Sequence, residues 1–98
     1  MRFKFRSKKL AGLYSDERGT HKYPPAVVEA FFDAMGIIDA ALDERDLYAL
    51  KGLRYEKLKG PRKHQRSIRL GRQYRLILTV ERDDQGTYLA IINVEDYH

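Results

Sequence analysis

The chain has 98 residues, enough for one compact domain, and we expect a single domain over residues 1–98. It has no cysteine, which excludes disulfides and thiolate metal sites, and its three histidines are too scattered to suggest zinc. A net charge of +5 favours an anionic partner, and no apolar run resembles a signal peptide or membrane span, so we expect a cytoplasmic protein without membrane contact.

The N-terminal residues are predicted to form a short strand followed by a short helix. Phe3 and Phe5 alternate with charged residues, as in a strand, and Ser7 is placed to cap a helix that reaches Tyr14. Residues 16–22 are polar and include a glycine, so they read as a loop. The two prolines that follow favour the start of a second helix, because proline tolerates the first helical turn.

The second helix is predicted to be amphipathic and half-buried. Its apolar residues follow helical spacing, at Val27, Phe31, Met35, Ile38 and Leu42. This stripe is typical of a core rather than a cofactor site, and we expect no cofactor. Acidic residues oppose the helix dipole at a C-terminus, so the helix is expected to end near Leu42, with Asp43 capping a short turn.

Charge is distributed unevenly along the chain. Between residues 24 and 50 there are six acids and one arginine, whereas nine cations and one acid, Glu56, lie between residues 54 and 75. The nine cations are Arg54, Lys57, Lys59, Arg62, Lys63, Arg66, Arg69, Arg72 and Arg75. This basic segment is typical either of a solvated face or of a surface that binds a polyanion.

The segment from 66 to 80 is predicted to be a β-hairpin with a three-residue loop at 71–73. This loop places the apolar residues on one face, whereas a two-residue turn would mix charges into both faces. Arg69 then lies opposite Arg75 on the polar face. Like charges that face each other are unfavourable, so an anion between them is the preferred interpretation; the alternative is that both side chains extend into water.

A last strand completes the prediction. Residues 83–86 read as a turn, and the following strand is expected to place Ala90, Ile92 and Val94 in the core. A strand, helices and then several meandering strands indicate an α+β domain, with helices packed on one face of an antiparallel sheet. The opposite face is left for the paired arginines and the C-terminal residues, and it could bind a single-stranded nucleic acid.

The chain ends in a carboxylate, a phenol and an imidazole, at Asp96, Tyr97 and His98. Near the basic strands, these groups could hold RNA phosphates while protons move to and from a ribose oxygen. His98 is the best proton shuttle because an imidazole titrates near neutral pH, although a terminal residue is ordinarily frayed. The residues therefore favour an RNA-cleaving domain that requires no metal.

Four segments carry a resemblance to a known family. Leu58-Lys59-Gly60, Ser67-Ile68-Arg69, Gln73-Tyr74-Arg75 and Glu95-Asp96-Tyr97-His98 together resemble the HigB branch of the RelE/ParE toxin superfamily, most strongly over residues 54–98. The resemblance implies a RelE-like fold, with an N-terminal strand and helices on one face of a small antiparallel sheet. It also implies a bacterial toxin of a type II toxin-antitoxin pair. Such toxins cleave mRNA in the ribosomal A site and are held inactive by a helix-turn-helix antitoxin of the HigA type.

The same resemblance implies roles for particular residues. Lys59, Arg69 and Arg75 would bind and neutralise the scissile phosphate, while the three C-terminal residues would orient the nucleotide and move protons. Some family members have a histidine three places before this lysine, where the present chain has Glu56. Glu56 is either the general base or the partner of a neighbouring lysine. The remaining cations of the basic segment assigned to RNA binding are Lys57, Arg62, Lys63, Arg66 and Arg72.

The expected reaction is attack of a ribose 2′-hydroxyl on the adjacent 3′-phosphate, with His98 or Glu56 as the base. Two alternatives stay open at this point. The ParE branch of the superfamily uses this fold without catalysis, to inhibit DNA gyrase, and a passive RNA-binding module would also be basic. The C-terminal Asp96-Tyr97-His98 disfavours the ParE reading, because it resembles the ribonuclease branch.

Overall fold

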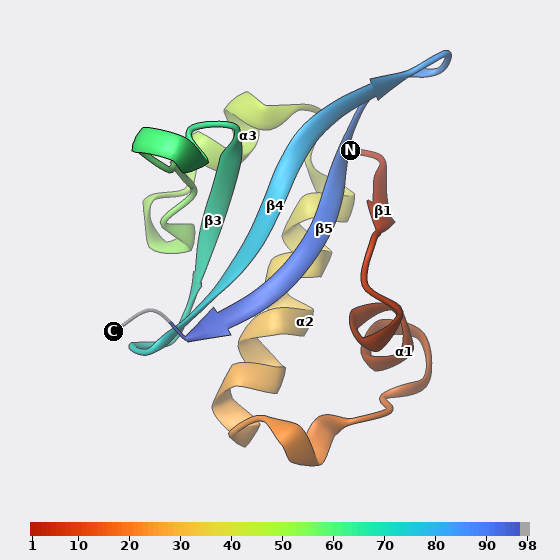
Figure 1. Cartoon of the computed structure of the whole chain (residues 1–98), viewed down its shortest axis with the longest axis vertical. Helices are drawn as coiled ribbons and strands as arrows, with labels where there is room; N and C mark the ends of the chain where they lie inside the picture. Colours follow the sequence, from red (N-terminus) through yellow and green to blue (C-terminus); the bar gives the residue numbers. More distant parts are fainter. Residues whose placement is uncertain (97–98) are drawn as a thin grey trace.

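The computed structural model describes residues 1–96, in which five strands form one sheet in the order β1-β5-β4-β3-β2 and three α-helices cover one face (Figure 1). The strands are β1 (Phe3–Phe5), β2 (Glu56–Lys57), β3 (Gln65–Leu70), β4 (Tyr74–Asp83) and β5 (Gly86–Asp96). The helices are α1 (Lys8–Asp16), α2 (Pro25–Ala40) and α3 (Glu44–Ala49), with short 3₁₀ turns η1 (Thr20–Lys22), η2 (Lys51–Leu53) and η3 (Gly60–Arg62). The predicted α+β class is confirmed.

The sheet is mixed rather than purely antiparallel. Strands β2 to β5 pair antiparallel, but β1 joins the edge of β5 in parallel, with Lys4 beside Ala90. Parallel pairing requires a crossover, and here the whole helical layer lies between β1 and β5 in the sequence. None of the helices within residues 1–96 is long and apolar enough to cross a bilayer.

The helix starts follow the predicted capping signals. The Ser7 side chain accepts a hydrogen bond from the backbone N–H of Leu10 at 3.2 Å, and α1 continues two residues past Tyr14 to Asp16. Within the predicted loop, residues 20–22 form the turn η1. Helix α2 begins at Pro25, where the missing N–H of proline costs no helical hydrogen bond.

The end of α2 differs from the prediction. The helix stops at Ala40, so Leu42 lies beyond it with 87% of its surface exposed, and its assignment to the core was wrong. The physical reason is the next helix, whose first turn is acidic and therefore stabilised by the helix dipole. Asp43 caps α3 by accepting a hydrogen bond from the Arg45 N–H at 2.9 Å, so the expected cap is present but begins a helix rather than a turn.

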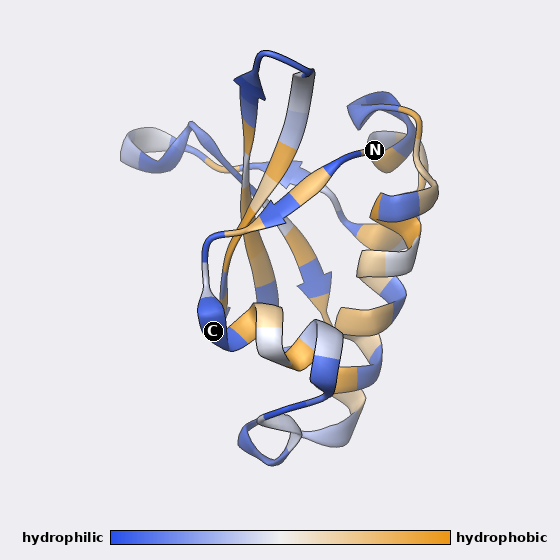
Figure 2. Ribbon diagram, turned by 90° about the vertical axis from the view of Figure 1, so that its right-hand side faces the viewer, coloured by the Kyte–Doolittle hydropathy of each residue, from blue (hydrophilic) through white to orange (hydrophobic). Residues whose placement is uncertain are grey.

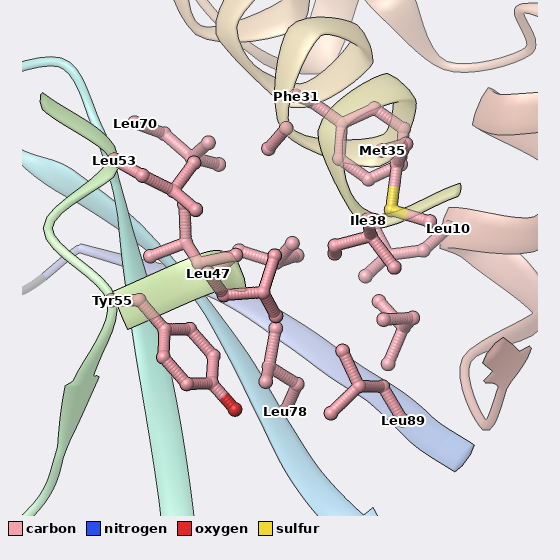
Figure 3. Close-up of a cluster of buried hydrophobic side chains, with 14 of the residues drawn as sticks. Leu10, Phe31, Met35, Ile38, Leu47, Leu53, Tyr55, Leu70, Leu78 and Leu89 are labelled. Atoms are coloured by element: carbon pink, nitrogen blue, oxygen red, sulfur yellow. The ribbon is translucent and has the colours of Figure 1, made fainter. Parts of the chain in front are cut away.

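The core lies between the helices and the sheet. Figure 3 shows Phe31, Met35 and Ile38 of α2 on one side and Leu78 and Leu89 of the sheet on the other. All five are almost fully buried, as the helical stripe predicted for the residues of α2. The strands carry hydrophobic residues (Figure 2), in runs such as Leu76 to Leu78 of β4, and successive side chains of each run point to opposite faces of the sheet.

The β3–β4 hairpin has the predicted register. Leu70 pairs with Tyr74, Ile68 with Leu76, and Arg69 with Arg75, so the three-residue loop over 71–73 is confirmed. Gly71 in this loop has a φ of +80°, a backbone conformation that favours glycine. The predicted turn over 83–86 is also present, between β4 and β5.

Strand β5 contains a β-bulge at Ile92 that the sequence did not predict. Leu78 pairs with Ile91 while Ile77 pairs with Asn93, so Ile92 is an extra residue. Regular pairing from the turn already places Leu89 and Ile91 in the core cluster, and the bulge then brings Val94 to the same side. The expectation is therefore confirmed for Val94 but wrong for Ala90, which is buried on the opposite face, and for Ile92, which is half-buried outside the cluster.

Candidate active site on the open face of the sheet

We call the sheet face opposite the helices the open face. Two rows of paired residues cross it. One row holds Glu56 of β2 beside Ser67 of β3, and the other holds Arg69 of β3 beside Arg75 of β4. Their side chains share the open face because the core residues occupy the alternate positions of the same strands.

Four of these residues, together with Arg54, line a small hollow. Its lining residues are Arg54, Glu56, Ser67, Arg69 and Arg75, and it encloses about 20 Å³. Such a volume holds little more than a water molecule, so a nucleotide would lie over the hollow rather than inside it. The structure thus brings together one carboxylate and three guanidinium groups, and three of these four residues are predicted catalytic ones.

Two residues that line the hollow, Ser67 and Arg54, are not in the predicted set of site residues, and Arg54 is the charged one. It follows η2 in a left-handed conformation, with a φ of 55°, and this turn directs the chain into β2. The sequence feature that could have pointed to Arg54 is its position as the first cation of the basic segment. Its conformation could not be read from the sequence, because arginine rarely adopts a positive φ.

Glu95 of β5 provides an anion on the open face. It pairs with Arg75 across the strands, and its carboxylate accepts hydrogen bonds from Nε of Arg75 at 3.0 Å and from Nη2 at 2.6 Å. It also accepts two hydrogen bonds of 2.9 Å from the guanidinium of Arg62. The protein itself therefore supplies an anion beside Arg75, between this residue and Arg62, whereas the sequence predicts an anion between Arg75 and Arg69.

The two arginines control the charge of Glu95. Hydrogen bonds from Arg62, and then from Arg75, lower its pKa from 4.5 to about 2, although burial acts in the opposite direction. Glu95 is therefore a carboxylate at any physiological pH. Glu95 lies in one of the segments that carry the family resemblance, but the sequence assigns it no role; regular pairing from the turn over 83–86 would place Val94 opposite Arg75 instead.

The cations assigned to RNA binding do not all lie on one face. Lys59, Arg62 and Lys63 belong to the connection between β2 and β3, and Arg62 is held over the open face by Glu95. Arg72 is exposed in the β3–β4 loop. These residues lie in the connections between β2, β3 and β4, the strands that line the hollow.

Arg66 lies on the helix side of the sheet instead. It pairs with the core residue Leu78, and its Nε donates to Glu44 of α3 at 2.8 Å, with only 15% of its side chain exposed. Tyr55 donates a hydrogen bond of 2.8 Å to the same carboxylate. Lys57 pairs with Arg66 and so faces the same side. Arg66 fastens β3 to α3, and the structure separates it from the hollow.

The C-terminal residues are described as far as Asp96. Its carboxylate accepts a hydrogen bond from Nε2 of Gln73 at 2.8 Å, and it follows Glu95 on the strand, so it points to the other side of the sheet. Tyr97 and His98, two of the predicted catalytic residues, lie outside the described residues. Among residues 1–96, no three His, Cys, Asp or Glu side chains are placed to hold a metal ion together.

Comparison with known proteins identifies the family. Residues 3–98 match the profile of a family described as the RelE-like toxin of the type II toxin-antitoxin system HigB. The toxin HigB-1 of Vibrio cholerae is 39% identical over 77 residues, which cover 79% of this chain and 81% of that protein.

Solved structures have the same fold. The YoeB/ParE toxin from Agrobacterium tumefaciens superimposes with a TM-score of 0.61 at 17% identity, covering 100% of both chains. A chain of the YoeB-YefM complex from Staphylococcus aureus gives a TM-score of 0.58 at 22% identity, over 100% of this chain and 97% of that one. The profile match over nearly the whole chain, the HigB-1 relative and the shared fold lead to one conclusion: the chain belongs to the HigB-like family of RelE-like toxins of type II toxin-antitoxin systems.

Proposed function

We propose that this toxin is a metal-independent endoribonuclease that cleaves mRNA in the ribosomal A site and so inhibits translation. The observation that carries the proposal is the hollow in which Glu56, Arg69 and Arg75 meet. A carboxylate can accept a proton from a hydroxyl, and guanidinium groups can stabilise the negative charge that develops on a phosphate. Membership of the HigB-like family, which comprises toxins, supports the same function.

The reaction begins with the 2′-hydroxyl of a bound nucleotide. Glu56 removes its proton, the 2′-oxygen attacks the adjacent phosphorus, and the bond from phosphorus to the 5′-oxygen of the next nucleotide breaks. His98 donates a proton to that leaving oxygen, so the products are a 2′,3′-cyclic phosphate and a 5′-hydroxyl. Arg69 and Arg75 bind the phosphate oxygens, since their planar guanidinium groups suit two-point contact. Tyr97 stacks on a base and Asp96 orients its neighbours.

The remaining cations bind the RNA backbone around the cleavage point. Lys59, Lys63 and Arg72 are exposed around the open face, where they can contact successive phosphates of a single strand. The mRNA substrate places the active toxin on the ribosome in the cytoplasm. As its inhibitor we propose a helix-turn-helix antitoxin of the HigA type; the YoeB-YefM structure from Staphylococcus aureus is itself a complex.

The test is to map new 5′ ends on an mRNA incubated with purified toxin, with and without ribosomes programmed with that mRNA. We expect cuts within the A-site codon that depend on the ribosome. Arg75→Ala should slow cleavage by about 100-fold or more, because one charge-stabilising donor is lost. His98→Ala should also abolish cleavage.

A matched control removes an arginine from the same strand as Arg75 but at a distance from the hollow. Arg82→Ala removes an exposed arginine near the other end of β4, and it should cleave at the wild-type rate. Circular dichroism should show that all three variants are folded. If the folded wild type gives no product with or without ribosomes, the proposal is wrong, and inhibition of DNA gyrase becomes the activity to measure.

A further inference from the structure

Glu95 is placed where an anion is unexpected in a site that binds phosphate. Its carboxylate lies between Arg75 of β4 and Arg62 of η3 and accepts four hydrogen bonds of 2.6–3.0 Å from them. Its side chain is 23% exposed, and that of Arg75 is 21% exposed. Without the carboxylate, two guanidinium groups would face each other across this corner of the open face, which is unfavourable.

The β-bulge at Ile92 creates this arrangement. From the turn over 83–86 to Leu78 the pairing of β4 with β5 is regular, and it would continue to place Val94 opposite Arg75. The extra residue shifts the pairing by one, so that Glu95 faces Arg75 and Val94 packs against the core. The bulge thus places a charged residue on the open face and an apolar residue on the core face. Bulges commonly change the direction of a side chain next to a functional site.

Glu95 also connects two elements that carry the cations of the site. Arg62 belongs to η3, and Lys59 lies directly before that turn. Arg62 also donates a hydrogen bond of 2.7 Å from its Nε to the side chain of Gln65 at the start of β3. Because arginine side chains lose considerable rotamer freedom when they are fixed, a carboxylate that fixes two of them in advance lowers the cost of ordering them around a substrate.

The carboxylate also has a cost for RNA binding. It is anionic at neutral pH, so it repels an incoming phosphate and weakens the attraction that the arginines exert. A group that only increased RNA affinity would not carry this charge. A contribution of Glu95 to RNA cleavage, beyond its contribution to stability, therefore lies in geometry rather than in affinity.

We propose that Glu95 is a positioning residue, which holds the guanidinium groups of Arg75 and Arg62 in the orientation needed at the scissile phosphate and ties η3 to the open face. This proposal rests on the proposed ribonuclease function. It predicts a separation between rate and affinity: loss of the carboxylate slows the chemical step while RNA binding is unchanged or tighter.

The test is Glu95→Gln, which keeps the shape of the side chain but removes its charge. Single-turnover cleavage of ribosome-bound mRNA, measured over a range of toxin concentrations, gives the maximal rate and the concentration for half-maximal rate. We expect the maximal rate to fall by about 10- to 100-fold, since small misplacements at a reacting centre have effects of this size. The half-saturating concentration should stay equal or decrease.

Glu81→Gln is the matched control. Glu81 is a carboxylate on β4 that also pairs with an arginine, Arg6, at 3.2 Å, but it lies near the opposite end of β4 from Arg75. The control should cleave with wild-type rate and half-saturation, which would show that loss of one surface carboxylate is not sufficient.

A double-mutant cycle with Arg62→Gln tests the connection between β5 and η3. If Glu95 acts through Arg62 as well as Arg75, the effect of Arg62→Gln on the maximal rate should be smaller in the Glu95→Gln background than alone. Melting temperatures measured alongside would show whether each variant is fully folded at the assay temperature.

The possible results are distinct. A folded Glu95→Gln variant with the wild-type maximal rate would overturn the positioning role. So would a variant whose half-saturating concentration rises while its maximal rate is unchanged, because Glu95 would then serve binding alone. If wild-type toxin does not cleave at all, the proposed function itself fails, and the positioning role fails with it.

Discussion

At the scale of single residues, the charge of Glu95 makes stability depend on pH. Arg62 and Arg75 lower its pKa from 4.5 to about 2, so between these values the folded protein binds fewer protons at this site than the unfolded chain does. The stabilisation is therefore complete above about pH 4.5 and is lost as the pH falls towards 2.

We predict that wild-type protein and Glu95→Gln differ most in the free energy of unfolding at neutral pH, by about 1–3 kcal/mol, because the variant removes the charge of a carboxylate to which two arginines donate. Urea denaturation should show this difference shrinking below about pH 4.5. Asp83 is an acid whose pKa is also lowered, by Arg2 and Lys4, but it is present in both proteins and cancels. A difference that stays constant down to pH 2.5 would contradict the assignment.

Single residues also show how far the site could be predicted from the sequence. Arg69 and Arg75 were placed correctly on one face, because strand alternation and a short loop determine their positions. Arg66 belongs to the same basic segment but bonds to Glu44, which lies 22 residues earlier in the chain. Neither spacing nor charge reveals such a long-range contact, so the segment could not be divided into site and scaffold in advance.

At the scale of elements, short loops made the fold predictable and a bulge made it less so. The β3–β4 register followed from a loop in which Gly71 supplies a positive φ. Strand β5 was predicted with uninterrupted alternation of Ala90, Ile92 and Val94, but the alternation changes phase at the bulge, so Leu89 and Ile91 face the core before it and Val94 after it. A bulge has no strong sequence signal, and it determines that Glu95 rather than Val94 is opposite Arg75.

Helix α2 offers a second prediction at this scale. Gly36 is exposed inside the helix, and no atom lies within 4 Å of the position that a Cβ would take. Gly36→Ala should therefore raise the free energy of unfolding by about 0.5–1 kcal/mol, because alanine loses less backbone entropy than glycine on folding. Urea denaturation at neutral pH measures the difference.

Gly12 in α1 is the matched comparison. A Cβ there would lie 3.3 Å from Nε and Nη2 of Arg18, so the arginine side chain must shift before alanine fits. The stabilisation from Gly12→Ala should therefore be smaller than that from Gly36→Ala. Equal gains at both positions would show that the contact with Arg18 has no energetic weight.

At the scale of the whole molecule, the exposed surface of α2 and the hollow differ in charge. The exposed acids Glu29, Asp33 and Asp39 belong to α2, whereas three arginines and one carboxylate line the hollow. A polyanion is therefore attracted to the hollow and repelled by the surface of α2. This difference can orient the toxin before any specific contact with RNA forms.

The last prediction concerns the salt dependence of RNA binding, measured with an RNA whose 2′-hydroxyls are methylated so that it cannot be cleaved. Lys63 is exposed at the end of η3, and Lys63→Ala should reduce the slope of log affinity against log salt by about one, because one fewer counterion is released. Asp33→Asn also changes the net charge by one, in the opposite sense, but on α2. The slope for Asp33→Asn should equal that of the wild type, since we expect no RNA phosphate to contact α2. If the two substitutions altered the slope equally, net charge alone would govern RNA binding, and the open face would have no special part in it.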